Sequence, residues 1–433
     1  MKHWIKDQHF RSLLKNTSYL AISKGVAAIA SLATLVFAGR GLGLATFGML
    51  ILIVSYSQAA SGLSRFQSWQ IVIRYGGRVD EPDRQADFKT ATGFAFALDA
   101  VSGLAGMVVA IALAPLIGPW LGLTGDNVRY AMLYCAILPT MAAATPNGVL
   151  RALDRFDLSS WQQTMTPIFR ALLTILAWAQ GWTLTAYLLI WFVTDLGGDL
   201  YMWFLGWREL RRRDLLKGIK PTLRPTSLPG AWPFAIQVNL TSSLQSAWGP
   251  VARLIVGGLL GPASAALYRI AGSLADSAQK PADLIARAYY PELIRMDLTT
   301  KHPWKFMKRA IIASAMFAGA AILLMLLGGK PLLGAAFGKE FLPAYAPLLV
   351  LLGVPLLTIV SFPLPSTLYA LDRPDVPLKA RIIATLGYFA VIGPLAHFSG
   401  LQGAAFAYLL ANALLVLTMV IYLRTEYRRV RGK

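Results

Sequence analysis

The sequence predicts an all-α polytopic membrane protein of about twelve transmembrane helices, arranged as two six-helix bundles related by a parallel internal repeat. The composition is the first indication, since 56% of the residues are hydrophobic and 14% are charged, whereas soluble proteins have about 25% charged residues. The second is a series of apolar stretches, each near the length that crosses a bilayer. The third is a motif that occurs once in each half of the chain. Together these observations exclude an ordinary soluble globular protein.

The internal repeat is carried by two short matches at the same offset. Residues 150–157 read LRALDRFD and residues 368–375 read LYALDRPD, with six of eight positions identical. The same offset of 218 residues aligns GRGLGLATFG (39–48) with GGLLGPASAA (257–266). Each match lies just outside a long apolar stretch. Two matches at one offset indicate a chain built from two copies of one unit.

Twelve apolar stretches are predicted to cross the membrane. Each is close to the ~20 residues that span a bilayer, and turn-forming or charged residues separate them. The predicted spans are 16–40, 46–75, 89–115, 128–150, 159–180, 183–207, 231–256, 263–290, 305–328, 343–369, 378–398 and 401–423.

Basic residues lie almost entirely on one side of these spans. The two tails and the loops after even-numbered spans hold 30 of the 41 Lys and Arg residues. The opposite side has only Arg40, Arg129, Lys330 and Lys339. The positive-inside rule therefore places both termini in the cytoplasm. The net charge of +20 then reflects membrane topology, and no nucleic-acid partner is expected.

The domain organisation follows from the repeat. Residues 1–207 are predicted to form an N-terminal six-helix bundle and residues 231–433 a C-terminal one. Because six is even, both copies have the same orientation in the membrane, as in transporters with parallel repeats. The basic segment 208–230, with its Pro and Gly residues, is predicted to be a cytoplasmic linker.

Polar residues recur along one face of four predicted spans. In the span 263–290 they are spaced by four and three residues in alternation, which places them on one side of a helix. The repeat offset maps a similar stripe of the span 46–75 onto it, and the spans 231–256 and 16–40 carry polar residues at related positions. The residues of these faces are Lys24, Ser55, Gln58, Arg65, Gln237, Thr241, Gln245, Arg253, Arg269, Ser273, Asp276, Lys280, Asp283 and Arg287.

Contact of these polar faces with lipid would cost free energy, so we expect them to line a water-filled cavity shared by the two halves. Basic residues outnumber acidic ones there, which predicts an anionic substrate, and the Arg guanidinium suits phosphate oxygens. One alternative is structural, because Asp276 and Lys280 are four residues apart and can pair along one helix, as can Asp283 and Arg287. The candidate cations for substrate binding are Lys24, Arg65, Arg253, Arg269, Lys280 and Arg287.

The carboxylates of Asp99, Asp195 and Asp199 form a second group within the spans of the first half. Buried carboxylates exchange protons or bind cations, so one interpretation is an ion-coupling site. The other is structural, namely pairing with Arg170 of the same bundle. Both interpretations are compatible with the sequence.

Motifs for nucleotide, metal or dinucleotide binding are absent from the sequence. It has no Walker A motif, its four His residues show no metal-ligand spacing, and Cys135 is the only cysteine. The fragment GRGLG joins two membrane helices, without the βαβ context of a dinucleotide site. No cofactor or metal is expected.

Several stretches resemble one family. The opening NTSYL, the turn GRGLGLATFG, the loops LDRFD and LDRPD, and FGKEFLPAYAPLLVLL (337–352) are similar to the Wzx-type polysaccharide flippases of the multidrug/oligosaccharidyl-lipid/polysaccharide (MOP) exporter superfamily. The resemblance covers essentially the whole chain. It implies two six-helix bundles in the bacterial inner membrane, with the first, second, seventh and eighth helices lining the central cleft.

The resemblance also implies a function. A Wzx-type flippase moves an undecaprenyl-pyrophosphate-linked oligosaccharide, such as an O-antigen, capsule or exopolysaccharide unit, from the cytoplasmic to the periplasmic leaflet. Its expected partners are the bilayer, the lipid-linked anionic oligosaccharide, and the polysaccharide polymerase with its chain-length machinery. The matching cleft cations are Lys24, Arg65, Arg253 and Arg269.

Two other functions remain open. A cation-coupled multidrug antiporter of the same fold would have an apolar, acidic cleft, whereas the predicted cleft is net positive. A membrane glycosyltransferase or phosphotransferase usually needs a folded extracytoplasmic loop, but the outward loops predicted here are short. We therefore expect a transporter and not an enzyme.

Overall fold

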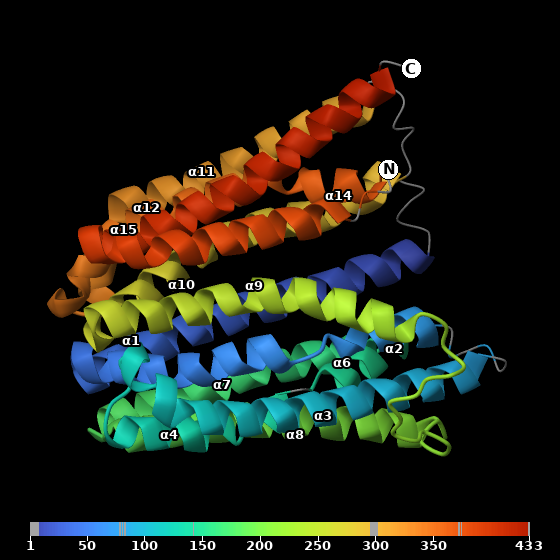
Figure 1. Ribbon diagram of the computed structural model, residues 1–433, viewed down its shortest axis with the longest axis horizontal. Helices are drawn as coiled ribbons and strands as arrows, with labels where there is room; N and C mark the ends of the chain where they lie inside the picture. The colour runs from blue at the N-terminus through green and yellow to red at the C-terminus, as the bar shows by residue number, and fades with distance from the viewer. Residues whose placement is uncertain are drawn as a thin grey trace. The chain divides into compact units, whose positions relative to one another are not determined.

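The computed structural model describes residues 8–431 except 78, 80, 82–83, 142, 295–301, 371–372 and 374, and side chains mainly within 24–279 and 312–425. Every regular element in this described part is helical, and the helices follow all twelve predicted spans in order (Figure 1). The predicted all-α membrane class is confirmed. Within the described residues, five helical stretches are long and apolar enough to cross a membrane, and a bent pair adds a sixth.

The elements have the following bounds. They are α1 (Gln8–Ser64), α2 (Ser68–Gly76), α3 (Gln85–Ile117), η3 (Pro119–Leu121), α4 (Asp126–Cys135), α5 (Leu138–Met141), α6 (Ala144–Ala152), α7 (Phe156–Ala179), α8 (Leu184–Arg212), α9 (Ala231–Leu260), α10 (Pro262–Ile294), α11 (His302–Ala336), η4 (Lys339–Ala344), α12 (Tyr345–Leu351), α13 (Gly353–Ser361), α14 (Pro363–Ala370) and α15 (Asp375–Arg431).

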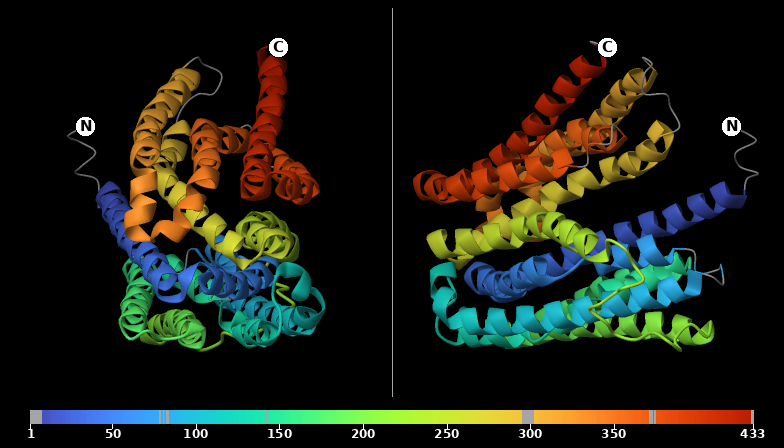
Figure 2. Two further views of the ribbon diagram at one scale, coloured as in Figure 1. Left: turned by 90° about the vertical axis from the view of Figure 1, so that its left-hand side faces the viewer. Right: turned by 45° about the vertical axis from the view of Figure 1, so that its right-hand side comes forward.

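Glycines with positive φ mark the turns between consecutive spans. Gly43 (φ 70°) breaks α1 into two arms, and Gly261 (φ 87°) separates α9 from α10. These two glycines are related by the repeat offset, so both copies make the same left-handed turn, which only glycine adopts without strain. Gly400 (φ 59°) does the same inside α15, whose two arms fold back on one another (Figure 2).

Two spans of the first half are interrupted. The span 46–75 breaks at residues 65–67, between the end of α1 and the start of α2. The span 128–150 consists of three short helices, α4, α5 and α6. Breaks inside a membrane leave backbone N–H and C=O groups that need partners other than water or lipid. The residues that supply these partners become candidates for function.

The chain divides into two compact units, which we describe separately. Unit 1 comprises Met1–Leu42 with Ile53–Pro250, and unit 2 comprises Gly43–Leu52 with Val251–Lys433. The division passes through α1 and through α9 at Pro250. Within unit 2 the ring of Phe47 packs edge-on against Phe341, with 6.2 Å between centroids. The organisation into bundles 1–207 and 231–433 stays a prediction.

The basic segment 208–230 belongs to unit 1 and packs against it. Leu215 and Leu228 are buried in two hydrophobic clusters with residues of α2 and α3. The N–H of Thr222 donates to the carbonyl of Gly93 over 3.4 Å. The indole N–H of Trp232 donates to the carbonyl of Leu223 over 2.9 Å. This segment is therefore an ordered strap in the described structure.

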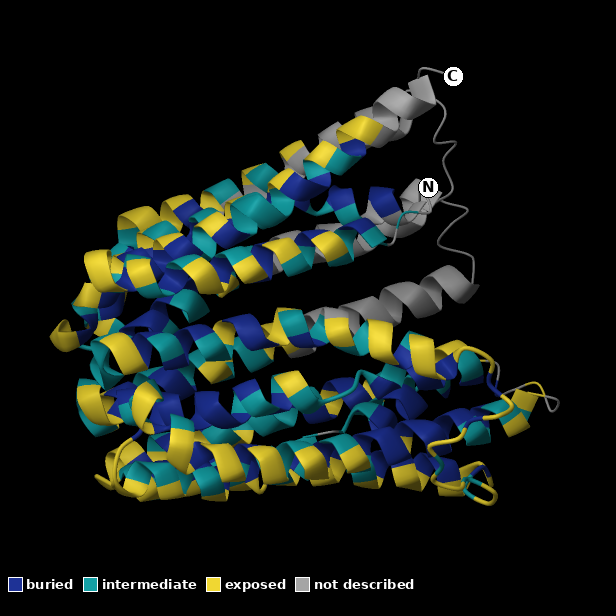
Figure 3. Ribbon diagram, viewed as in Figure 1, coloured by how far each residue is buried: buried dark blue, intermediate teal, exposed yellow. Residues whose placement is uncertain are grey.

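The outer faces of unit 1 are apolar. Figure 3 shows exposed residues alternating with buried ones along α3 and α8. The exposed positions include Val108 on α3, Leu172 on α7 and Leu189 on α8, which are 61%, 57% and 61% exposed. Large aliphatic side chains at such exposure fit contact with lipid hydrocarbon. Polar side chains on the same helices therefore need another explanation.

Candidate functional site

Unit 2 contains a cluster of charges on α9 and α10, and one of its arginines is buried. Arg253 of α9 is only 6% exposed. Its guanidinium interacts electrostatically with Arg269 and Asp276 of α10, and the phenol groups of Tyr268 and Tyr408 lie in the same environment. Arg269 interacts with the Asp276 carboxylate as well. Among the side chains that the structure describes, the cluster holds two guanidinium groups and one carboxylate. That it binds an anion stays a prediction.

Unit 1 carries its own polar face. Arg65 lies in the break between α1 and α2, and its Nη1 donates to the carbonyl of Met141, at the end of α5, over 3.1 Å. It therefore joins the two interrupted spans. Gln237 and Gln245 of α9 are exposed, and so is Lys24 of α1. We expect exposed polar side chains on membrane helices to face water, because lipid offers them no hydrogen bonds.

The remaining residues of the predicted faces have mixed positions. Ser55 is buried, Gln58 and Ser273 are part-buried, and Asp276 is exposed. That the faces of the two units form one cavity stays a prediction. Four predicted side chains lie outside the described residues, so the alternative of pairing along α10 also remains untested; they are Thr241, Lys280, Asp283 and Arg287.

Asp99 of α3 is almost fully buried, at 1% exposure, and it accepts hydrogen bonds from both interrupted spans. The Ser68 hydroxyl, at the first residue of α2, donates over 2.5 Å. Thr145, the second residue of α6, donates through its backbone N–H over 2.9 Å and through its hydroxyl over 2.7 Å. The carboxylate therefore lies at the positive ends of two half-helices, where a negative charge is stabilised.

Asp195 and Asp199 of α8 lie in a different environment from Asp99. Asp195 forms an ion pair with Arg170 of α7 and accepts a hydrogen bond from the Tyr134 hydroxyl over 2.7 Å. The Nε of Arg170 donates to the Thr194 hydroxyl over 2.8 Å. Asp199, one turn further, makes no hydrogen bond or ion pair within the described part of the chain. Its electrostatic neighbours include Asp195 and Arg170.

The repeated loops LDRFD and LDRPD contain the same ion pair. Arg155 donates from Nε and Nη2 to the two carboxylate oxygens of Asp157, over 2.9 Å in each case. Arg373 donates in the same way to Asp375, over 3.1 and 3.4 Å. Each carboxylate lies in the first turn of a helix. The Arg155 guanidinium holds the pKa of Asp157 below its ordinary value. In unit 1, Arg155 also reaches the buried Glu209 of α8 over 2.7 Å.

Sequence reasoning missed the hydroxyl partners of the carboxylates. Ser68, Thr145 and Tyr134 were not among the predicted site residues. A signal exists for Thr145, because a hydroxyl residue followed by Pro146 is typical of a helix start. The groups that meet at Asp99 come from three distant segments, so their contact depends on the tertiary structure. Among the described residues no group of His, Cys, Asp and Glu side chains is placed to hold a metal ion.

Comparison with known proteins adds a family and a fold. Residues 13–297 match the family described as polysaccharide biosynthesis protein. The inner membrane protein YghQ of Escherichia coli K12 is 37% identical over 348 residues, which cover 80% of this chain and 98% of YghQ.

Solved structures of two transporter types are similar over most of the chain. An inward-facing multidrug-resistance transporter of the MATE family in the MOP superfamily has a TM-score of 0.74 at 14% identity, covering 94% of this chain and 96% of its own. The lipid II flippase MurJ, in an inward closed conformation, has a TM-score of 0.72 at 13% identity. The match covers 94% of this chain and 87% of MurJ. At these identities the structures establish the fold alone.

Proposed function

Because the chain belongs to the polysaccharide biosynthesis protein family and has the MOP-superfamily fold, we propose that it is a flippase for lipid-linked oligosaccharides. Its substrate would be an undecaprenyl-pyrophosphate-linked repeat unit, moved from the cytoplasmic to the periplasmic leaflet of the bacterial inner membrane. The mechanism would be alternating access. The relative YghQ is named as an inner membrane protein, which supports this location.

One observation carries the proposal, the charge cluster of Arg253, Arg269 and Asp276 in unit 2. Two guanidinium groups held close together repel each other, and desolvation adds to their cost. A pyrophosphate offers several anionic oxygens, which match the planar N–H donors of arginine better than a single carboxylate does. An anionic head group bound there would stabilise both arginines.

The predicted cations Lys24 and Arg65 lie in unit 1, where they are further candidates for binding an anionic group. The exposed amides of Gln237 and Gln245 offer donors and acceptors suited to sugar hydroxyls. Gln58 and Ser55 of α1 are further polar residues of unit 1. We also propose that the protein works with the polymerase that joins the flipped units and with the proteins that set the chain length. Only its membership of the family supports these partners.

The first test replaces Arg269 by alanine in a strain that lacks the chromosomal copy. We expect polymer export to fall at least about tenfold, since the variant loses a charge-assisted contact to the substrate. The matched control is Arg129→Ala, because Arg129 is an exposed arginine paired with Asp126 over 3.4 Å. Immunoblotting of membranes must show equal amounts of both variants. Normal export by Arg269→Ala would remove the anion-site argument.

For energy coupling, we propose that Asp199 binds the coupling cation or proton. Asp99 and Asp195 lie in the same half of the chain as Asp199. The carboxylate of each already accepts hydrogen bonds or forms an ion pair with side chains of other helices. Asp199 is the carboxylate of the three that makes no such bond in the described structure, so a cation or proton meets the least competition there.

A second candidate is a cation-coupled multidrug antiporter, which the acidic pair Asp195 and Asp199 and the MATE-like fold support equally well. The net positive cluster of unit 2 disfavours cationic drugs. Measuring drug resistance alongside polymer export separates the two functions. A strain without the protein would become drug-sensitive with normal export under the antiporter function, and would lose export with unchanged resistance under the flippase function.

A further inference from the structure

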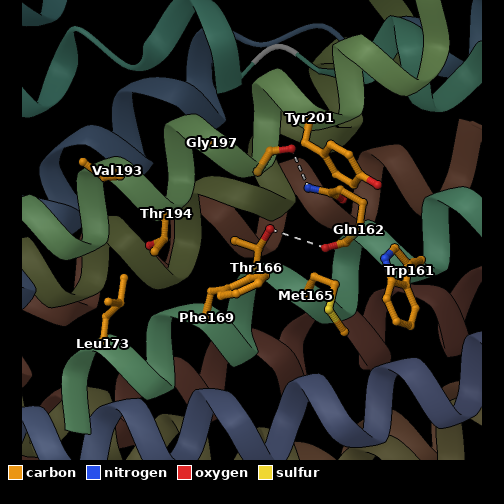
Figure 4. Close-up of a pocket in the computed structure, with 11 residues that line it drawn as sticks. Trp161, Gln162, Met165, Thr166, Phe169, Leu173, Val193, Thr194, Gly197 and Tyr201 are labelled. Atoms are coloured by element: carbon orange, nitrogen blue, oxygen red, sulfur yellow. Dashed lines mark hydrogen bonds between the residues drawn. The ribbon is translucent and has the colours of Figure 1, made fainter. Parts of the chain in front are cut away.

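Helices α7 and α8 of unit 1 enclose a groove that shares only Thr194 with the charged groups described above. The two helices pack side by side, and the groove between them has a volume of about 490 Å³ (Figure 4). It runs along α7 from Trp161 to Leu173 and along α8 from Val193 to Tyr201. Phe169 and Val193 on its rim are 58% and 50% exposed, so the groove opens on the outer apolar surface.

The length of the groove suits an extended hydrocarbon chain. Twelve helical residues separate Trp161 from Leu173, a length of about 18 Å. That is a little more than half of the ~30 Å hydrocarbon core of a bilayer. An alkyl or isoprenoid chain that extends along the groove contacts its walls over this length.

The walls of the groove are mainly apolar, and the side chains of Gln162, Thr166 and Thr194 hydrogen-bond within the protein. The amide Nε2 of Gln162 donates to the carbonyl of Gly198 over 2.8 Å. The Thr166 hydroxyl donates to the Gln162 carbonyl over 3.4 Å, as Figure 4 shows. The Thr194 hydroxyl donates to the Ile190 carbonyl over 2.8 Å. The groove therefore suits an apolar ligand.

An aromatic and basic path continues from the end of the groove along α8. The ring of Tyr201 stacks on Phe204 with 6.3 Å between centroids, and Phe204 lies 6.3 Å from Trp207. The guanidinium of Arg211 then lies over the Trp207 ring at 5.4 Å. Arg208 is exposed, two helical turns from Tyr201 on the same face. This is the helix end that the positive-inside rule assigns to the cytoplasm.

We propose that this groove binds the isoprenoid chain of the substrate in the cytoplasmic leaflet, with its phosphate groups at Arg208 and Arg211. The inference rests on the proposed flippase function and adds a docking site on the lipid-facing surface. Its two parts match the two parts of the ligand, an apolar channel for the chain and cations for the head. Phospholipids also have anionic heads, and the test below separates them from the isoprenoid substrate.

The test measures lipid binding to the purified full-length protein by native mass spectrometry. The probes are undecaprenyl phosphate and, as the two-chain anionic control, dioleoyl phosphatidylglycerol. Gly197→Leu fills the groove, and an added Cβ at Gly197 meets no atom within 4 Å, so the helix tolerates it. Gly393→Leu on α15 is the matched control, because Gly393 also has open space around its Cβ.

We expect Gly197→Leu to weaken undecaprenyl phosphate binding about tenfold or more, since the chain loses contact along several CH₂ groups. Gly393→Leu should bind like the wild type. The double substitution Arg208→Ala with Arg211→Ala should also weaken binding, and phosphatidylglycerol should compete poorly. If Gly197→Leu is unstable in size-exclusion chromatography, Val193→Trp blocks the same groove from its exposed rim.

Two outcomes overturn the groove assignment. One is unchanged undecaprenyl phosphate binding by both blocking variants, and the other is equal competition by phosphatidylglycerol, which would make the groove a general lipid site. A different outcome would contradict the proposed flippase function. If the wild-type protein shows no saturable binding of undecaprenyl phosphate at all, the substrate class itself is wrong.

Discussion

Asp99, Asp195 and Asp199 share a chemical type but differ in what surrounds each carboxylate. Asp99 accepts three hydrogen bonds from Ser68 and Thr145. Asp195 is neutralised by Arg170 and bonded to Tyr134. Asp199 has charged neighbours and no direct partner in the described structure. The sequence showed that the three residues lie within spans, but their partners come from other helices, so their differing roles could not be inferred from spacing.

At Asp199 we expect the substitution Asp199→Asn to abolish acceleration of transport by a pH gradient while substrate binding is retained, because an amide neither binds nor releases the coupling ion. The measurement is flipping by reconstituted protein with and without the gradient. Asp126→Asn is the control, since Asp126 forms an exposed pair with Arg129. An Asp199→Asn protein that still responds to the gradient like the wild type would show that Asp199 does not couple.

We expect the charge of Asp157 to affect the stability of the fold and not transport. Its pKa is lowered by the Arg155 guanidinium, so its contribution is present above the ordinary pKa of an aspartate and disappears as the pH falls through the lowered value. Because Asp157 is half exposed, we expect Asp157→Asn to cost less than about 1 kcal/mol near pH 7. Thermal unfolding of both proteins between pH 7 and strongly acidic pH should show the difference vanish. A constant difference at all pH values would contradict this assignment.

The helices end in two ways, at glycine turns between spans and at breaks inside spans. The turns at Gly43 and Gly261 agree with the sequence repeat, because a glycine at equivalent positions signals the same backbone conformation. The breaks at α1–α2 and within α4–α6 were not anticipated. Hydropathy averages over a window and treats such a stretch as one span, whereas the break is stabilised by Asp99, which is distant in sequence.

Asp99 therefore stabilises two half-helices at once, and we expect Asp99→Asn to lower the free energy of unfolding by about 1–3 kcal/mol. The asparagine side chain keeps one acceptor oxygen but brings an NH₂ group toward the donors of Ser68 and Thr145. Denaturant unfolding in detergent, followed by tryptophan fluorescence, measures the effect. Asp126→Asn again serves as the control. A variant as stable as the wild type would mean that Asp99 does not hold the two helix starts.

For the whole molecule, composition and periodicity were sufficient to predict the membrane class, and the resemblance of its motifs indicated the family. The membrane class and the family could be predicted because composition, periodicity and short motifs are read directly from the sequence. The compact units do not follow from them, because Gly43–Leu52 packs with unit 2 and the first part of α9 with unit 1. Such an exchange depends on contacts such as that of Phe47 with Phe341, which no local pattern reveals.

We propose that arginines of the charge cluster bind the pyrophosphate of a lipid-linked oligosaccharide during its transfer between leaflets. A flipping measurement tests this role in proteoliposomes loaded with fluorescent undecaprenyl-pyrophosphate oligosaccharide, with wild type, Arg269→Ala and Arg129→Ala compared at equal protein content. We expect the wild type and Arg129→Ala to transfer the lipid at the same rate, and Arg269→Ala to be at least about tenfold slower. Equal rates for all three proteins, or no transfer by the wild type above protein-free vesicles, would contradict the claim.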